Sequence, residues 1–223
     1  MKNILITGTS RGIGKALAQK FLAEGFFVIG TSTKGVSVSD MADQNFVMFQ
    51  LDLTDPKSIK SCAEKVIKLQ KPINILINNA GVVWVEKNNN GEREINIDTL
   101  RKTLETNLIG PIDFTLQVVP VINSGGHIVN LSSRQGSLNY VHEMKNPSYQ
   151  ISKAGVNMFT RVLSFQLKDK IRVSSVHPGA VLTDMAAADA DMKPEEAAEY
   201  IYKLAISEPE TGQFWFKGES FPW

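Results

Sequence analysis

Lys153 follows Tyr149 by four residues in a segment with helical periodicity, so the two side chains should lie on one helix face. A phenol has an ordinary pKa of about 10 and is a poor proton donor at neutral pH. A neighbouring ammonium stabilises the phenolate and lowers that pKa. Of the four tyrosines in the chain, only Tyr149 has a lysine at this spacing. The pair is a candidate for proton transfer, with a chance surface pair as the alternative.

The helix that carries this pair has a clear predicted start. Asn146 is a good N-cap residue, and Pro147 suits the first helical position. Tyr149 would then lie in the first turn, where the helix dipole favours a negative phenolate. An apolar stripe on the same helix is expected to pack inward and to leave Tyr149 and Lys153 free for chemistry; its members are Ile151, Met158, Val162 and Phe165.

A second candidate site lies at residues 7–14, which read Thr-Gly-Thr-Ser-Arg-Gly-Ile-Gly. The turn leaves a predicted strand and begins a predicted helix, which is the context that a dinucleotide-binding turn requires. Its glycines allow a tight bend, and backbone N–H groups at the helix start can then bind a diphosphate. An ordinary strand-to-helix loop is the alternative. The predicted binding residues are Gly8, Ser10, Arg11, Gly12, Ile13 and Gly14.

The end of the second predicted strand indicates which dinucleotide binds. NAD enzymes place an acid there to hold the ribose 2′-hydroxyl. This chain has Thr33 and Lys34 instead, and its next acid is Asp40. Hydroxyl groups and the charges of Arg11 and Lys34 would suit a 2′-phosphate. We therefore predict NADP(H), although Lys34 would also be ordinary as a solvated loop residue.

Small and polar residues follow the third and fourth predicted strands. Asp52, followed by Leu53, is placed to accept a hydrogen bond from an adenine amino group. It is also a potential helix cap, but Thr54 and Asp55 are better placed for capping. After the next strand, small residues would let the backbone pass close to a flat ring; these are Asn79, Ala80 and Gly81.

Two further polar positions are candidates for chemistry. Asn107 lies inside a predicted helix just before Gly110-Pro111. A polar residue beside a helix break often marks a bound water or ligand, and a plain kink is the alternative. Ser132 and Ser133 end a buried strand, where either hydroxyl would also serve to cap a turn.

Short apolar runs alternate with longer amphipathic segments. The runs predict strands at Ile4–Thr7, Phe26–Thr31, Phe46–Gln50, Ile73–Asn78, His127–Leu131 and Ile171–Val176. The amphipathic segments predict helices at Gly12–Glu24, Pro56–Gln70, Asp98–Val119, Pro147–Lys168 and Pro194–Ala205. This alternation predicts one α/β domain over residues 1–223, with βαβ units, a doubly wound parallel sheet and helices on both faces. Ligands of such sheets bind at the carboxyl ends of the strands, where the least regular stretches fall: Glu86–Glu94, Asn139–Asn146 and Ala186–Lys193.

The composition argues against several function classes. Lys+Arg is 24 and Asp+Glu is 23, so no charge excess predicts binding to nucleic acid or to an anionic membrane surface. No apolar run is long enough to cross a bilayer, and no signal peptide fits before the first predicted strand. Cys62 is the only cysteine, which excludes an internal disulfide and a thiolate metal cluster. We expect Cys62 to be a packing residue, no bound metal, and a cytoplasmic protein.

Taken in order along the chain, these motifs resemble the signature of the short-chain dehydrogenase/reductase family. The resemblance covers nearly the whole chain, and it adds Pro178, Gly179, Val181 and Thr183 to the set. Each motif is weak alone, but their shared order and spacing leave little room for coincidence. The ending, Thr211–Phe216 with Pro222-Trp223, is similar to that of small carbonyl reductases.

The resemblance implies a single-domain Rossmann fold with a doubly wound parallel sheet of order 3-2-1-4-5-6-7, and it implies a role for each residue. Tyr149 would donate a proton to a carbonyl oxygen while NADPH gives a hydride to the carbon. Lys153 would lower the Tyr149 pKa and hold the nicotinamide ribose. Ser133, rather than Ser132, would hydrogen-bond the substrate oxygen, and Asn107 would hold a water that links Lys153 to solvent. The nicotinamide end would be lined by Pro178, Gly179, Val181 and Thr183.

The chain departs from the family pattern in two loops. The segment before Tyr149 is slightly longer than usual, and His142 within it is a less favoured candidate for a second acid. The segment from Thr183 to Pro194 is short, so we expect a small lid over an open site. His177 is expected to be structural. The longer loop also carries residues that would suit either a substrate pocket or an exposed loop: Tyr140, Glu143 and Met144.

These observations favour an NADPH-dependent reductase of ketones or aldehydes with a small-molecule substrate. The same site would also suit an alcohol dehydrogenase, because Tyr149 can act as acid or base. Two competing hypotheses are a regulator that binds NADP(H) with little catalysis and a reductase of acyl-carrier-protein substrates. Family relatives pair through the helices at Asp98–Val119 and Pro147–Lys168, so a homodimer or homotetramer is expected.

Overall fold

The computed structural model describes residues 1–36, 41, 43–88, 90–185 and 190–223. Its centre is a sheet with the strand order β3-β2-β1-β4-β5-β6-β7-β8. The first seven strands pair in parallel, as predicted, and β8 joins β7 antiparallel. The strands are β1 Asn3–Ile6, β2 Phe27–Ser32, β3 Phe46–Gln50, β4 Ile73–Asn78, β5 Ile122–Leu131, β6 Ile171–Val176, β7 Gln213–Phe216 and β8 Glu219–Ser220.

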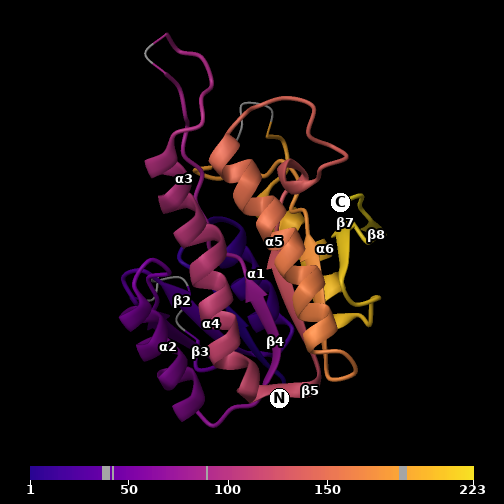
Figure 1. The fold of residues 1–223 in the computed structure, drawn as a ribbon. Helices are drawn as coiled ribbons and strands as arrows, with labels where there is room; N and C mark the ends of the chain where they lie inside the picture. Colours follow the sequence, from indigo (N-terminus) through magenta and orange to yellow (C-terminus); the bar gives the residue numbers. More distant parts are fainter. Residues whose placement is uncertain (37–40, 42, 89, 186–189) are drawn as a thin grey trace.

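Helices cover both faces of the sheet, and α4 and α5 cross its near face in Figure 1. Side chains alternate across a strand, so Ile4 and Ile6 of β1 enter a core with α1 and α6, whereas Leu5 enters a core with α2, α4 and α5. The structure is thus a doubly wound α/β domain. The helices are α1 Gly12–Ala23, α2 Pro56–Lys68, α3 Ile97–Leu104, α4 Gly110–Val118, α5 Pro147–Gln166 and α6 Pro194–Ile206.

The long helix predicted at Asp98–Val119 contains the expected interruption. A π-helical turn, η2 (Glu105–Ile109), separates α3 from α4 and contains the buried Asn107. Such single π turns are often found at functional sites.

The helix starts agree only in part with the prediction. Asp55 caps α2 as expected, its carboxylate accepting a 2.9 Å hydrogen bond from the backbone N of Lys57. Asn146 is the N-cap residue of α5 and Pro147 its first residue, as predicted, but the Asn146 side chain makes no capping hydrogen bond. The carboxylate of Glu86 instead accepts from the backbone N of Ser148 at 2.9 Å. A cap from so distant a segment leaves no local sequence pattern.

The prediction that the apolar stripe of α5 packs inward is also wrong. The buried face of α5 is largely polar, although Leu163 on it joins the core, and the hydrogen bonds of its polar side chains to the sheet offset the cost of burial. Asn157 accepts from the Ser175 hydroxyl at 2.8 Å, and Thr160 accepts from the Asn130 amide at 2.9 Å. The helix therefore turns its apolar side outward, with exposed fractions of 42–64% for Ile151, Met158, Val162 and Phe165.

Three further features bear on function. Among the described helices, none has the length and apolar character needed to cross a membrane. The described residues also contain no cluster of His, Cys, Asp and Glu arranged to hold a metal ion. Cys62 is buried in α2, where burial raises the pKa of its thiol to about 12, consistent with a packing role.

Candidate active site

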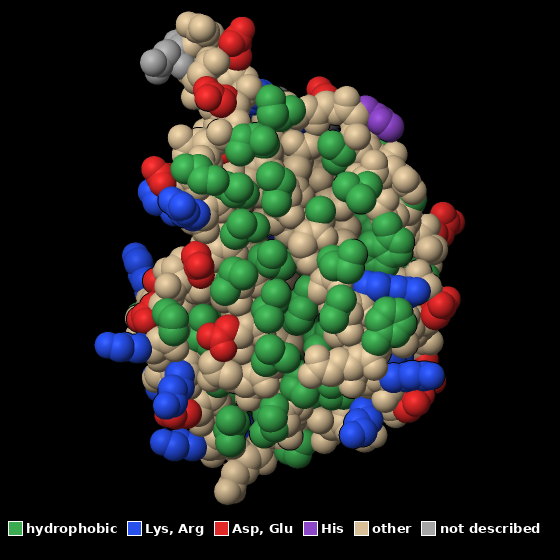
Figure 2. Space-filling model, in the orientation of Figure 1, with side chains coloured by type: hydrophobic (Ala, Val, Ile, Leu, Met, Phe, Trp, Pro, Cys, Tyr) green, Lys and Arg blue, Asp and Glu red, His purple; other side chains and the backbone are tan. Residues whose placement is uncertain are grey.

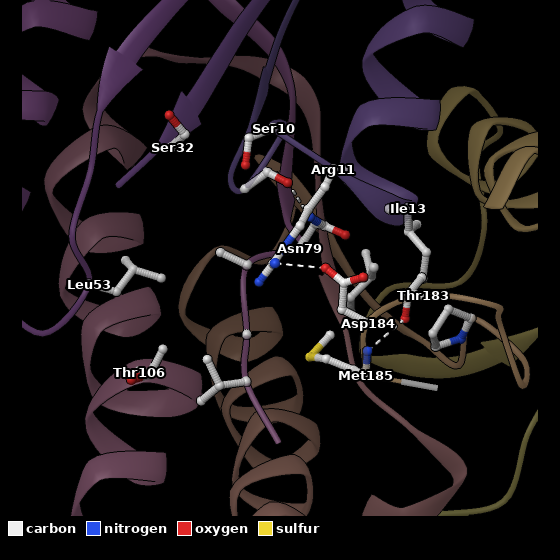
Figure 3. Close-up of a pocket in the computed structure, with 18 of the residues that line it drawn as sticks. Ser10, Arg11, Ile13, Ser32, Leu53, Asn79, Thr106, Thr183, Asp184 and Met185 are labelled. Carbon is white, nitrogen blue, oxygen red and sulfur yellow. Dashed lines mark hydrogen bonds and ion pairs between the residues drawn. The ribbon is translucent and has the colours of Figure 1, made fainter. Parts of the chain in front are cut away.

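A cavity of about 440 Å³ opens at the carboxyl ends of the central strands (Figure 3). It lies where the strand order reverses between β1 and β4, the usual ligand position in this sheet type. The glycine turn, Asp52-Leu53, Asn79–Gly81, Tyr149 and Lys153 all contribute to its wall. Segments far apart in the sequence therefore meet in one site.

The glycine turn forms a cradle that fits a diphosphate. Gly8 and Gly12 have φ values of +74° and +56°, a region that favours glycine. A Cβ on Gly14 would lie 2.1 Å from the carbonyl oxygen of Gly8, so no other residue lets α1 start this close to the turn. The first turn of α1 has no acidic residue and no side-chain cap. Its N–H groups are thus suited to an anion.

The end of β2 supplies hydroxyl groups to one side of the cavity. Ser32 and Thr33 line the wall, but Lys34 is exposed and lies outside it. Arg11 lines the wall too, and its guanidinium donates to the Asp184 carboxylate at 2.7 Å. Asp40, the next acid in sequence, lies outside the described residues. Arg11 and the hydroxyl groups are therefore the groups available to a 2′-phosphate.

The next two strand ends shape the floor of the cavity. Asp52 accepts two hydrogen bonds from Thr54, from the backbone N at 2.9 Å and from the hydroxyl at 2.7 Å, and this orients its carboxylate beside Leu53. The Asn79 amide donates to the carbonyl oxygens of Thr7 and Gly8 at 2.8 Å and 3.1 Å. Asn79 thus ties the end of β4 to the glycine turn.

Tyr149, Lys153 and Ser133 come together as predicted. The Lys153 Nζ lies 5.5 Å from the centre of the Tyr149 ring and donates to the Leu131 carbonyl at 2.7 Å. Burial lowers the pKa of Lys153 to about 8. Burial also raises the pKa of Tyr149, and a hydrogen bond with the Ser133 hydroxyl acts in the opposite direction. The expected lowering of the Tyr149 pKa by Lys153 is not seen, because burial outweighs other effects.

Asn107 joins this group from the π turn. Its Oδ1 accepts from the backbone N of Val82 at 2.8 Å, and its Nδ2 donates to the Val82 carbonyl at 2.8 Å and to the Ser152 hydroxyl at 3.1 Å. A Cβ on Gly81 would lie 3.2 Å from Asn107 Oδ1 and 3.7 Å from Lys153 Nζ. The glycine thus leaves open space between the two groups.

Of the four residues predicted to line the nicotinamide end, two line the cavity and two do not. Pro178 and Thr183 line the cavity. Val181 lies in the hydrophobic core and forms a β-bridge with Met192. Gly179 packs against Met192 as well, since a Cβ there would approach its terminal methyl group to 2.8 Å. Val181 and Gly179 therefore pack against Met192 and are not among the residues of the cavity wall.

The loop before Tyr149 contributes little to the cavity. Tyr140 packs on Phe221 and accepts a hydrogen bond from Arg134 at 3.1 Å, and His142 is exposed on the surface. Glu143 and Met144 are exposed as well. His177 stacks on Phe216 at 4.7 Å, and burial lowers its pKa to about 3, in line with a structural role.

The structure adds residues that the sequence motifs did not identify. Asp184 faces Arg11, and nothing in the sequence pairs these two residues. Ser132, which the sequence placed second to Ser133, lines the cavity wall, whereas Ser133 is not among the wall residues. The Ser132 hydroxyl donates to the Lys153 carbonyl at 3.2 Å. The other wall residues outside the predicted set are Thr31, Ser32, Leu51, Val82, Thr106, Leu131, Leu182, Met185 and Pro194.

Comparison with known proteins identifies the family. A family model described as short chain dehydrogenase matches residues 2–194. The chain therefore belongs to the short-chain dehydrogenase/reductase family, whose members are oxidoreductases that bind a nicotinamide cofactor.

Two groups of relatives are similar over most of the chain. Identity is 32% over 196 residues with the 3-oxoacyl-(acyl-carrier-protein) reductase FabG of Salmonella typhimurium, covering 85% of this chain and 78% of the relative. Identity is 27% over 278 residues with carbonyl reductase (NADPH) 1 of Mus musculus, covering 98% of this chain and 97% of the relative.

Solved structures agree in fold. Carbonyl reductase Sniffer of D. melanogaster superposes with a TM-score of 0.87 over all of both chains at 24% identity. A short chain dehydrogenase from Burkholderia cenocepacia, solved in complex with NADP, has a TM-score of 0.81 at 25% identity and covers 96% of this chain and 95% of its own. These matches support the predicted sheet order and the Rossmann fold.

Proposed function

We propose that this protein is an NADPH-dependent reductase that converts a ketone or aldehyde to an alcohol. The observation that carries the proposal is the shared position of Tyr149, Lys153 and the glycine turn in one cavity, with Ser133 hydrogen-bonded to the phenol. When bound, NADPH would supply a hydride to the carbonyl carbon. A proton donor must carry its proton at neutral pH, and the phenol of Tyr149 meets that condition.

The other residues orient the substrate and restore the proton. Ser133 would donate a hydrogen bond to the carbonyl oxygen and hold it near the phenol. Lys153 would hydrogen-bond the nicotinamide ribose. Asn107 Oδ1 has accepted one hydrogen bond and keeps a second lone pair, which suits a water in the space above Gly81. Such a water would connect Lys153 to solvent and allow Tyr149 to be reprotonated.

NADP(H) is our proposed cofactor, and the wall near β2 supports it. Arg11, Ser32 and Thr33 offer a cation and two hydroxyl groups to a 2′-phosphate. The short chain dehydrogenase from Burkholderia cenocepacia, solved in complex with NADP, agrees with this proposal. Because Lys34 lies outside the cavity wall, Arg11 is the cation on which the proposal depends.

The test is NADPH consumption with a panel of quinones, diketones, aldehydes and steroids, with NADH as control. The panel should include a 3-oxoacyl carrier-protein substrate, since the 32% identity with FabG favours that second candidate. Turnover of small carbonyls supports our proposal, and turnover of the carrier-linked substrate alone supports the second candidate. Tight NADPH binding without turnover would favour a regulator, and faster oxidation of alcohols would favour a dehydrogenase.

We further propose that the chain forms a homodimer or homotetramer. Figure 2 shows hydrophobic side chains gathered over α4 and α5. A large exposed apolar patch usually marks a protein interface, and a second copy presenting the same face would cover it. The patch includes Ile97, Ile109, Leu116, Ile151, Met158, Val162 and Phe165. We also propose that the assembly is cytoplasmic, a compartment in which a free thiol such as that of Cys62 stays reduced.

A further inference from the structure

Glu86 is a buried carboxylate that holds the start of the helix carrying Tyr149. It lies in the segment between β4 and α3 and is 3% exposed. Its Oε2 accepts from the backbone N of Ser148 at 2.9 Å, and its Oε1 accepts from the Ser148 hydroxyl at 2.7 Å and from the backbone N of Asn96 at 3.2 Å. A carboxylate is tolerated in such a buried place only when its oxygens are hydrogen-bonded, and both are.

The contact with Ser148 acts on the first turn of α5. Ser148 is the second residue of α5, and Tyr149 follows it directly. The first N–H groups of a helix have no partner within the helix, so this turn loosens unless another group caps it. A negative charge at this end is also favoured by the helix dipole. Glu86 supplies both the acceptors and the charge that the side chain of Asn146 does not.

The segment that carries Glu86 is also connected by hydrogen bonds to the part of α5 that follows Tyr149. Four residues before Glu86, Val82 exchanges two hydrogen bonds with the Asn107 side chain, each 2.8 Å long. Asn107 in turn donates to the Ser152 hydroxyl at 3.1 Å, which donates to the Tyr149 carbonyl at 2.8 Å. Residues 82–86 therefore connect to α5 both before and after the tyrosine.

We propose that Glu86 is a positioning residue for Tyr149, which fixes the direction of the phenol by capping the first turn of α5. The inference rests on the proposed function, since it assigns proton transfer to Tyr149. Glu86 lies outside the cavity wall and acts through the helix start, without touching the substrate. Its removal leaves the Ser148 donors unpaired, while the glycine turn at the other end of the cavity stays in place.

The kinetic test uses the full chain with Glu86→Ala and Glu86→Gln, and with Glu94→Ala as matched control. Glu94 is an exposed carboxylate in the same segment. A misplacement of about 1 Å can cost about 100-fold in rate, so we expect Glu86→Ala to lower kcat by about 10- to 100-fold, with the NADPH Kd unchanged. Glu86→Gln keeps one acceptor oxygen and should lose less. Glu94→Ala should match the wild type.

A double variant distinguishes a positioning role of Glu86 from general destabilisation of the protein. If Glu86 acts through the phenol, Glu86→Ala causes no further loss of turnover in a Tyr149→Phe background. An equal fold-loss in both backgrounds overturns the proposal, as does wild-type kcat in Glu86→Ala. If Glu86→Ala fails to fold, judged by circular dichroism and NADPH binding, Glu86→Gln decides by the same criteria.

Hydrogen–deuterium exchange gives a readout that needs no turnover. We expect the amides of residues 148–150 to exchange faster in both Glu86 variants than in the wild type and Glu94→Ala, with α1 unchanged. Unchanged exchange at 148–150 overturns the proposal whatever the kinetics show. If the wild type reduces no carbonyl in the panel, the proposed function fails, and this measurement still decides whether Glu86 orders the turn of Tyr149.

Discussion

The Arg11 guanidinium and the Asp184 carboxylate form a 2.7 Å ion pair across the mouth of the cavity (Figure 3). Arg11 comes from the glycine turn, and Asp184 comes from the segment after β6. Their side chains are 75% and 70% exposed. An ion pair this exposed contributes at most about 1 kcal/mol, so a phosphate dianion can compete with Asp184 for Arg11.

Substitutions of Arg11 and of Asp184 should change the affinity for NADPH in opposite directions. Asp184→Asn leaves Arg11 available to the 2′-phosphate and should tighten NADPH binding by up to about fivefold, the equivalent of about 1 kcal/mol. Arg11→Ala removes a charge-assisted hydrogen bond and should weaken NADPH binding by about 10- to 100-fold. Fluorescence titration measures both, with NADH as the control ligand. Parallel changes in NADH and NADPH affinity would contradict a role for Arg11 at the 2′-phosphate.

Tyr149→Phe removes the proposed proton donor and little else. We expect turnover to fall by at least about 100-fold, the usual contribution of a positioned acid, while NADPH binding is retained. Ser133→Ala should also lower kcat, since the substrate oxygen loses a hydrogen-bond donor. Steady-state kinetics together with cofactor titration measure these effects. A Tyr149→Phe variant that loses binding and turnover equally would rule out the assigned role.

Lys153 should set the alkaline limit of the reaction. Burial lowers its pKa to about 8, so its ammonium loses a proton as the pH rises through that value. Because kcat/KM reports the ionisation of the free enzyme, we expect kcat/KM for NADPH to fall above pH 8. A profile that stays flat from about pH 7 to about pH 9.5 would show that the charge of Lys153 is dispensable.

The sequence predicted the fold and most of the cavity wall, because both depend on local patterns. Strand and helix periodicity, the glycine turn and the Tyr149–Lys153 spacing are each contained in a few adjacent residues. Arg11–Asp184 and Glu86–Ser148 are contacts between residues far apart in the sequence, and no local pattern marks them. The prediction for the apolar stripe of α5 was wrong for a related reason: the buried side of α5 can be largely polar because β5 and β6 supply hydrogen-bond partners such as Asn130 and Ser175.

That outward apolar face predicts a change of oligomeric state on mutation. Met158 and Phe165 are each 64% exposed in the single chain, and a second copy would bury them. Met158→Glu and Phe165→Glu should shift the protein towards a monomer, because a charge cannot be buried unpaired at such an interface. Light scattering during size-exclusion chromatography measures the mass, and Ile206→Glu on α6 is the control. A monomeric wild type would contradict the proposed assembly.

His127 should make the fold sensitive to acid. It is buried in β5, where its ring contacts the Ala205 carbonyl at 3.1 Å and the Ser174 hydroxyl at 2.9 Å. Burial lowers its pKa from 6.5 to about 4. Between these values the unfolded chain binds a proton that the folded chain does not, so stability falls as the pH falls. One such histidine contributes up to about 1.4 kcal/mol per pH unit.

His127→Gln should therefore reduce the slope of unfolding free energy against pH between 6.5 and 4. Glutamine is neutral throughout this range and keeps hydrogen-bonding groups for the same two neighbours. A residual slope is expected from His177, whose pKa burial lowers to about 3. Urea unfolding at several pH values measures the slope for both proteins. An unchanged slope in His127→Gln would mean that His127 does not take up its proton on unfolding.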